Sequence, residues 1–274
     1  MRIPIYQVDA FASRVFAGNP AAVCPLPRWL NDALLQSIAN ENNLSETAFV
    51  VPEGDAYAIR WFTPRVEVDL CGHATLAAAH IVMEHLVAER LERIRFHSRS
   101  GPLFVTRDGE RLALDFPARP ARRVDMPQDL AAALGSAPRE VWEARDLLAV
   151  YDSEDEVREL APDFAAVAAL EAFAVCATAP GKHVDFVSRF FAPAQGVDED
   201  PVTGSAHCTL VPYWGARLGR DKLHARQISS RGGELFCTRR GERVTIAGHA
   251  VRFLEGWIEV DPELPASGIS LHEK

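Results

Sequence analysis

Hydrophobic and polar residues alternate in short runs along the first third of the chain, interrupted by two segments with helical spacing. Residues 29–40 form the first of these segments, with Asn31 as a candidate N-cap. Residues 73–90 form the second, and its first half is apolar on nearly every side, which is typical of a helix buried inside its domain. The alternating runs predict strands at 3–11, 21–24, 47–51 and 57–62, and a pair of strands over 93–116 around the Asp108–Gly109 turn.

The same pattern occurs a second time in the chain. Residues 98–111 read SRSGPLFVTRDGER, and residues 230–243, which start 132 positions later, read SRGGELFCTRRGER. Ten of these fourteen positions are identical, where ordinary residue usage gives roughly one by chance. The CGHA segment at Cys71 and the TGSA segment at Thr203 are separated by the same 132 positions. These ordered matches indicate a duplication.

A third match supports two homologous halves. The RWFTP segment that begins at Arg60 matches the RFFAP segment that begins at Arg189, 129 positions later. The Pro-rich segment 116–121 follows a strand pattern and suits a linker. We therefore expect one half over 1–120, which the C-terminal strand is a candidate to complete, and a second half over 121–274. Each half is predicted to be α+β, with a central helix (205–217 in the second half) wrapped by curled sheet and a binding site between the halves.

Composition narrows the possible functions. With 48% hydrophobic and 24% charged residues over 274 positions, the chain is typical of globular proteins. Its net charge of −9 and the lack of a basic run argue against nucleic-acid or anionic-membrane partners. The only lysines, Lys182, Lys222 and Lys274, lie outside the motifs, which disfavours pyridoxal chemistry. The five cysteines lack C-x-x-C spacing, and neither a signal segment nor a long apolar span is present, so we expect a reduced cytoplasmic protein.

The duplicated turns are candidate anion-binding sites. Gly72 and Gly204 each directly precede an apolar helix, where backbone N–H groups and the helix dipole favour an anion. The alternative is that each turn is an ordinary helix cap, in which the glycine is needed only for packing. The neighbours of the two glycines differ between the copies: Cys71 and His73 in the first, and Asp200, Thr203 and Ser205 in the second.

Three ionisable residues are candidates for proton transfer. His73 lies at a helix N-terminus, where the dipole disfavours its cationic form, so we expect a neutral imidazole. Asp200 belongs to an acidic cluster, 198–200, in which repulsion would raise a pKa, although a solvated loop is the plain alternative. Glu46 lies between a helix and a strand, and spacing alone does not separate it from an ordinary loop carboxylate.

The sequence resembles a known family at several motifs: DAFASRVFAGNPAAV, NLSETAFVV, RWFTPRVEVDLCGHATLAAA and DEDPVTGSAH. These segments are similar to those of the PhzF-like phenazine-biosynthesis proteins, which belong with the diaminopimelate epimerases and proline racemases in one fold group. The resemblance covers both halves in order. It implies two half-barrel domains, a site between them, a homodimer, and isomerase activity on a small molecule without cofactor or metal.

The resemblance also assigns roles to particular residues. It makes Glu46 the catalytic acid/base and makes Asp200 and His73 proton-relay or substrate-binding groups. The remaining substrate-binding residues that it implies are Gly72, Gly204, Ser205 and, more weakly, Asn19. The family substrate is a dihydro-hydroxyanthranilate, and the reaction moves a proton within a conjugated ring.

Other functions remain open at this point. Two-base epimerases of this fold group use one cysteine from each half, but here Cys71 is matched by Thr203, whose hydroxyl is too weak an acid. A non-catalytic protein that binds small acids is a second alternative. A metal enzyme is disfavoured because the histidines are not spaced as a compact ligand set: His73, His80, His85 and His207. Nucleotide use is unsupported, since the segment around Lys182 lacks phosphate-loop spacing.

Overall fold

The computed structural model describes residues 1–261, so the last part of the predicted second half, residues 262–274, lies outside the described residues. The elements follow one another in this order: β1 (Arg2–Ala10), β2 (Asn19–Pro25), α1 (Asp32–Asn42), β3 (Glu46–Glu53), β4 (Ala56–Phe62), β5 (Glu67–Val68), α2 (Gly72–Ile81), the π-helix η1 (Val82–Leu86), β6 (Arg93–Ser98), β7 (Gly101–Asp108), β8 (Arg111–Pro117), β9 (Arg122–Val124), α3 (Leu130–Leu134), β10 (Glu140–Glu143), β11 (Leu147–Val150), α4 (Glu154–Glu159), α5 (Phe164–Ala168), β12 (Val175–Pro180), β13 (Phe186–Ala192), the 3₁₀-helix η2 (Pro193–Gln195), β14 (Val197–Asp200), α6 (Gly204–Leu218), β15 (Lys222–Gln227), β16 (Gly233–Arg240), β17 (Arg243–Gly248) and β18 (Ala250–Glu259).

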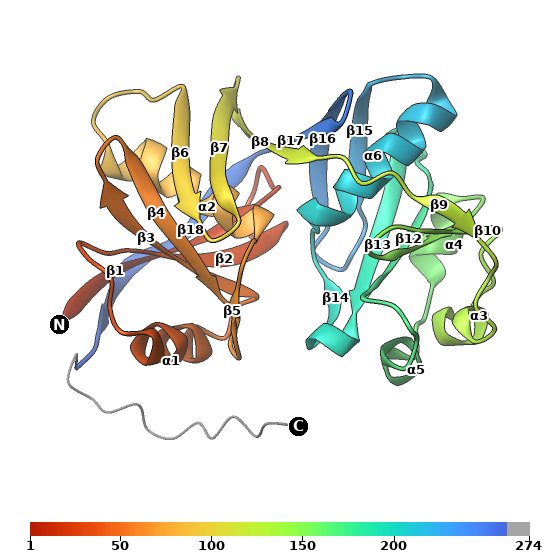
Figure 1. Cartoon of the computed structure of the whole chain (residues 1–274), viewed down its shortest axis with the longest axis horizontal. Helices are drawn as coiled ribbons and strands as arrows, with labels where there is room; N and C mark the ends of the chain where they lie inside the picture. Colours follow the sequence, from red (N-terminus) through yellow and green to blue (C-terminus); the bar gives the residue numbers. More distant parts are fainter. Residues whose placement is uncertain (262–274) are drawn as a thin grey trace.

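Two halves lie side by side, and each curls its strands around one helix, α2 or α6 (Figure 1). The strand pairing repeats between them. β2 is parallel to β3 and β3 is antiparallel to β4, just as β11 is parallel to β12 and β12 is antiparallel to β13. The fold is α+β with a central helix in each half, as predicted.

The two halves share strands. β8 pairs with β17 across the junction, and Ala113 lies opposite Ala247 in this ladder. β9 follows β8 in the chain but pairs with β10 of the second half. In return, β18 follows β17 but pairs with β1, and Figure 1 shows it crossing the first half. The halves are therefore joined by backbone hydrogen bonds as well as by side chains.

The duplicated sequence blocks adopt the same local structure. In the first half, Arg60 holds the two oxygens of Glu67 through Nε and Nη2, at 2.7 and 2.7 Å. In the second half, Arg189 holds Glu199 in the same bidentate way, at 2.8 and 2.9 Å. The first pair is seven residues apart and the second is ten, which accounts for the three extra residues in the second copy.

The three helices predicted from the sequence are present, although their ends differ, and the short helices α3, α4 and α5 were not predicted. α1 begins after Asn31, whose Oδ1 accepts a hydrogen bond from the backbone N–H of Leu34 at 2.8 Å, so the predicted N-cap is confirmed. The predicted helix over 73–90 was too long. α2 ends at Ile81 and widens into the π-turn η1, which closes with the N–H of Val87 bonded to the carbonyl of Val82. The helical pattern persists after residue 87, but most of this segment is exposed and has no apolar face to bury.

One continuous apolar core contains both central helices. It includes Ala77 and Leu76 from α2 and Leu210 and Trp214 from α6. α1 covers a smaller cluster on β3, and α3, α4 and α5 cover another on β12 and β13. Among the described residues, no helix is long and apolar enough to cross a membrane.

Candidate active site

A fully buried asparagine joins the two halves at the N-termini of the central helices. Asn19 is the first residue of β2. Its Nδ2 donates to Oδ1 of Asp200 at 2.7 Å and to the carbonyl oxygen of Val202 at 3.0 Å. The same nitrogen lies 3.3 Å from Nδ1 of His73 on α2. The structure thus places Asn19, His73 and Asp200 together.

Glu46 joins this group through His73. Oε2 of Glu46, at the start of β3, lies 3.0 Å from Nε2 of His73, and the two side chains are 18% and 7% exposed. These two atoms are therefore partners of one another, while Oδ1 of Asn19 makes no hydrogen bond among the described residues. Buried polar atoms normally have partners, so the unpaired Oδ1 of Asn19 leaves a position in this cluster that a ligand can complete.

The charge state of His73 differs from the expectation. Burial lowers the pKa of His73, but the neighbouring Cys71 and Glu46 side chains outweigh burial and raise that pKa well above its usual value. Burial in turn raises the pKa of the Cys71 thiol, so the sulfur stays protonated near neutral pH. The carboxylate of Glu46 is then the partner that stabilises a cationic His73. The prediction of a neutral imidazole was wrong, because the side chains beside His73 raise its pKa.

Asp200 is a partly buried acid at the end of β14. Burial raises its pKa from 3.8 to about 6, while the charge of His73 and hydrogen bonds from Thr203 and Asn19 oppose this rise. The predicted direction was right, but the main cause is burial, not repulsion within the acidic cluster. The neighbouring Glu199 is neutralised by Arg189. The plain alternative of a solvated loop therefore does not hold for Asp200.

Sequence reasoning missed Gln227, the last residue of β15. It is 1% exposed, and its Oε1 accepts a hydrogen bond from the N–H of Thr203 at 2.8 Å. Its Nε2 donates to the carbonyl of Asp200 at 2.7 Å. The Thr203 hydroxyl donates in turn to Oδ2 of Asp200. Gln227 therefore holds the turn that presents Asp200, and no motif marked it.

The N-termini of both central helices lack a side-chain cap. The N-cap residues are Cys71 for α2 and Thr203 for α6, and neither side chain accepts a hydrogen bond from its helix. A Cβ added at Gly72 would lie 3.5 Å from the ring of Phe116, and one at Gly204 would lie 3.9 Å from the ring of Phe11. These are ordinary contacts, so packing alone does not require glycine at either turn.

Ser205, the remaining predicted site residue, has a partner that the sequence did not indicate. Its Oγ accepts a hydrogen bond of 3.1 Å from Nη2 of Arg145, in the turn between β10 and β11. Ser205 lies one residue beyond Gly204, on the same turn of helix that follows Asp200 and Thr203.

One group of residues in the site has the chemistry of a metal site. Glu46, Cys71 and His73 each offer a ligand atom, and these atoms lie within 4.8 Å of one another. The imidazole, however, stands between the other two groups, with Nδ1 3.5 Å from Sγ of Cys71 and Nε2 3.0 Å from Glu46. Cys71 and Glu46 therefore lie at different ring nitrogens, so an ion bound to one nitrogen would have only one of these two groups beside it, and the order is unfavourable for chelation.

The other histidines that were weighed as metal ligands lie in different surroundings. The rings of His80 and His85 contact each other with centroids 5.8 Å apart. His207 is fully buried, and its Nδ1 donates to the carbonyl of Thr203 at 2.9 Å.

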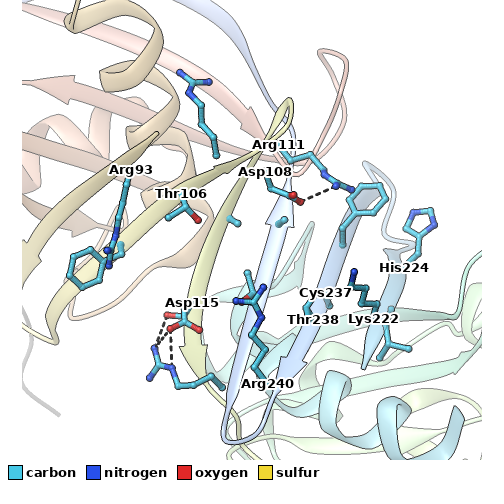
Figure 2. A pocket seen from close by; sticks show the side chains of 18 of the residues that line it. Arg93, Thr106, Asp108, Arg111, Asp115, Lys222, His224, Cys237, Thr238 and Arg240 are labelled. Carbon is cyan, nitrogen blue, oxygen red and sulfur yellow. Dashed lines mark hydrogen bonds and ion pairs between the residues drawn. The ribbon is translucent and has the colours of Figure 1, made fainter. Parts of the chain in front are cut away.

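A groove of about 800 Å³ lies elsewhere at the junction, across the strands on either side of the β8–β17 ladder (Figure 2). Its charged side chains are partly paired within it, as in Arg111 with Asp108 and Arg243 with Asp115. None of the residues predicted for the site lines this groove. It is therefore separate from the cluster around His73.

Comparison with known proteins identifies the family. The family model described as phenazine biosynthesis-like protein matches residues 8–256. An uncharacterized isomerase of Pseudomonas aeruginosa is 58% identical over 261 residues, which cover 95% of this chain and 100% of that protein. The crystal structure of a PhzF family protein of Enterococcus faecalis matches with a TM-score of 0.92 at 50% identity, over 95% of this chain and 100% of the other.

A more distant match extends the fold group. A hydroxyproline epimerase of Agrobacterium vitis has a TM-score of 0.60 at 12% identity, over 97% of this chain and 94% of that chain, which shows a shared fold only. The family match, by contrast, covers both halves and all seven predicted site residues. The chain belongs to the phenazine biosynthesis-like, or PhzF, family.

Proposed function

We propose that this protein is a cofactor-independent isomerase that moves a proton within a small, cyclic, unsaturated amino acid similar to dihydro-hydroxyanthranilate. The observation that carries the proposal is the cluster in which Glu46 lies 3.0 Å from His73, and Asn19 contacts both His73 and Asp200. A carboxylate, an imidazole and an amide that face one small ligand are the groups that proton transfer needs. The isomerase names of close relatives support the same reaction class.

In the proposed reaction, the Glu46 carboxylate removes a proton from one carbon of the substrate. The electron pair of that C–H bond moves into the conjugated system, and the new carboxylic acid returns the proton to a different carbon on the same face. No electrons are gained or lost overall. The cationic His73, 3.0 Å from Glu46, stabilises the carboxylate before transfer and can hydrogen-bond to a substrate amine or hydroxyl together with Asp200.

A two-base epimerase is the main alternative, and the surroundings of Cys71 and Thr203 speak against it. Burial raises the pKa of the Cys71 thiol, which leaves little thiolate to act as a base. The Thr203 hydroxyl is engaged with the Asp200 carboxylate and Gln227. A single carboxylate base is the arrangement that these contacts favour.

Turnover in D₂O separates the three candidate functions. Dihydro-hydroxyanthranilate would be incubated with the protein and followed by NMR. The proposal predicts a shifted double bond and a new C–H or C–D bond at a second carbon. An epimerase would invert one centre and leave the double bonds in place, and a binding protein would shift the ligand signals without exchange. Either of the last two results would refute the proposal.

The proposal extends to assembly and compartment. We propose a homodimer in the cytoplasm. Five buried cysteines, each free of disulfide bonds, are compatible with a reducing compartment. Sedimentation of the purified protein at micromolar concentration tests the dimer, and a monomeric mass would contradict it.

A further inference from the structure

Arg145 is held rigidly beside the N-terminus of α6. Its Nε and Nη2 donate to the two oxygens of Asp146, at 2.9 and 3.1 Å, and Nη2 also donates to Oγ of Ser205. The guanidinium lies over the ring of Phe173, 4.5 Å from its centroid. A surface arginine is normally mobile, so holding Arg145 through these three contacts costs side-chain conformational entropy.

This fixation leaves unused donors on Arg145. The contacts described above engage Nε and Nη2, while Nη1 makes no hydrogen bond within residues 1–261. Two N–H groups of a charged guanidinium are therefore available, and the side chain is 35% exposed. Asp146 is only 4% exposed, so its carboxylate anchors the arginine from the interior.

The contact with Arg145 also sets the orientation of the Ser205 hydroxyl. Because Oγ accepts from Arg145, its own proton is free to donate to another group. The α6 backbone N–H groups beside it lack a side-chain cap at Thr203. This turn therefore presents hydrogen-bond donors, while Glu46 and Asp200 supply the negative charge of the site.

We propose that Arg145 is a specificity-determining residue, which together with Ser205 binds the carboxylate of the substrate and so selects small acids. The proposal rests on the proposed function and adds the substrate class. A carboxylate only accepts hydrogen bonds, and a planar guanidinium matches its two oxygens. With the carboxylate held at Arg145, the reactive ring lies toward Glu46 and His73.

The position of Arg145 in the second half, which is comparable to that of Asn19 in the first half, supports this role. Asn19 opens β2, and Arg145 lies two residues before β11. β2 and β11 correspond between the halves, because each is parallel to the next strand, β3 or β12. Asn19 contacts His73, and Arg145 contacts Ser205, the residue 132 positions after His73. Each half thus places a polar side chain, from the start of β2 or from just before β11, against the first turn of its central helix.

The test uses two probes that differ in charge: anthranilate and its uncharged amide, 2-aminobenzamide. Calorimetry on the full-length protein would measure binding of both by the wild type, Arg145→Met and Arg145→Lys. The matched control is Arg139→Met, on the same β10–β11 hairpin, where Arg139 pairs with the exposed Asp152. Because Arg145→Met leaves Asp146 buried without its partner, the double variant Arg145→Met/Asp146→Asn is measured beside it.

The wild type should bind anthranilate about tenfold more tightly than 2-aminobenzamide. Arg145→Met and the double variant should lose about tenfold in affinity for anthranilate, with little change for the amide, and Arg145→Lys should recover part of it. Arg139→Met should bind as the wild type does. A wild type that does not bind anthranilate, or a double variant that binds it as well as the wild type, would overturn the role of Arg145. Neither result would bear on the proposed proton transfer at Glu46, which the conversion of substrate in D₂O tests separately.

Discussion

Nδ2 of Asn19 donates a hydrogen bond of 2.7 Å to Oδ1 of Asp200, although the two residues are 181 positions apart. This contact fixes the acid of the second half against the histidine of the first. It also explains why the candidate site needs both copies of the duplicated unit. The first half supplies Glu46 and His73, and the second supplies Asp200.

The raised pKa of Asp200 predicts a pH dependence of activity. Because burial raises this pKa to about 6, the carboxylate is protonated below that pH and charged above it. If the charged form assists the cationic His73, kcat/KM rises as the pH increases through about 6. Asp200→Asn should remove this acid limb and lower kcat by about 10²-fold.

The pH profile of the Asp200→Asn variant, measured from pH 5 to 8, checks this assignment. Asp198→Asn is the matched control, since Asp198 is an exposed member of the same acidic segment. An acid limb that persists unchanged in Asp200→Asn would contradict the role of Asp200.

The two histidines of α2 should affect stability in opposite directions with pH. The pKa of His73 in the folded protein is raised, so the stability that it contributes is full below the unfolded pKa of about 6.5 and is lost as the pH rises through the folded value. Burial lowers the pKa of His80 to about 4, so the folded state excludes a proton that the unfolded state binds. Stability from His80 therefore falls as the pH drops from about 6.5 toward 4.

Urea unfolding of His73→Gln and His80→Gln at pH 5.5 and 8 measures this contrast. The loss of stability in His73→Gln should be larger at pH 5.5, and that in His80→Gln should be larger at pH 8. The same pH trend in both variants would contradict the charge states assigned to the two histidines.

The duplicated SRSG and SRGG segments provide a matched pair of arginines. Arg231 donates to the buried Asp9 at 2.8 Å and to the carbonyls of Ala17 and Gly18 in the loop before Asn19. Its counterpart Arg99 pairs with Glu67 but is 56% exposed. Asp9 is 1% exposed, so Arg231→Ala leaves a buried charge without its cation, at a cost of about 3 kcal/mol. Arg99→Ala should cost less than about 1 kcal/mol.

Chemical denaturation of the two arginine variants gives the comparison directly. Equal losses in unfolding free energy would mean that the Asp9 contact does not hold the loop before Asn19.

Much of the site could be predicted because local motifs mark it. His73 and Asp200 lie beside duplicated glycine turns, and the family resemblance supplied Glu46, which spacing alone left ambiguous. Gln227 and Arg145 could not be found in this way, because their contacts depend on how β15 and the β10–β11 turn lie against α6. The early end of α2 was also not predictable from helical spacing, since the spacing continues past residue 87 while the segment is mostly exposed and has no apolar face to bury.

The most direct test of the account is proton transfer at Glu46. Conversion of dihydro-hydroxyanthranilate in D₂O would be followed by NMR, through the shift of its double bond, for the wild type, Glu46→Gln and Glu53→Gln. Glu53 is the matched control, because it is exposed at the far end of the same strand, β3. We predict that Glu46→Gln lowers the rate of conversion by at least about 10³-fold while still binding the ligand, and that Glu53→Gln converts the substrate at the wild-type rate. Conversion at the wild-type rate in Glu46→Gln would contradict the central role of this carboxylate.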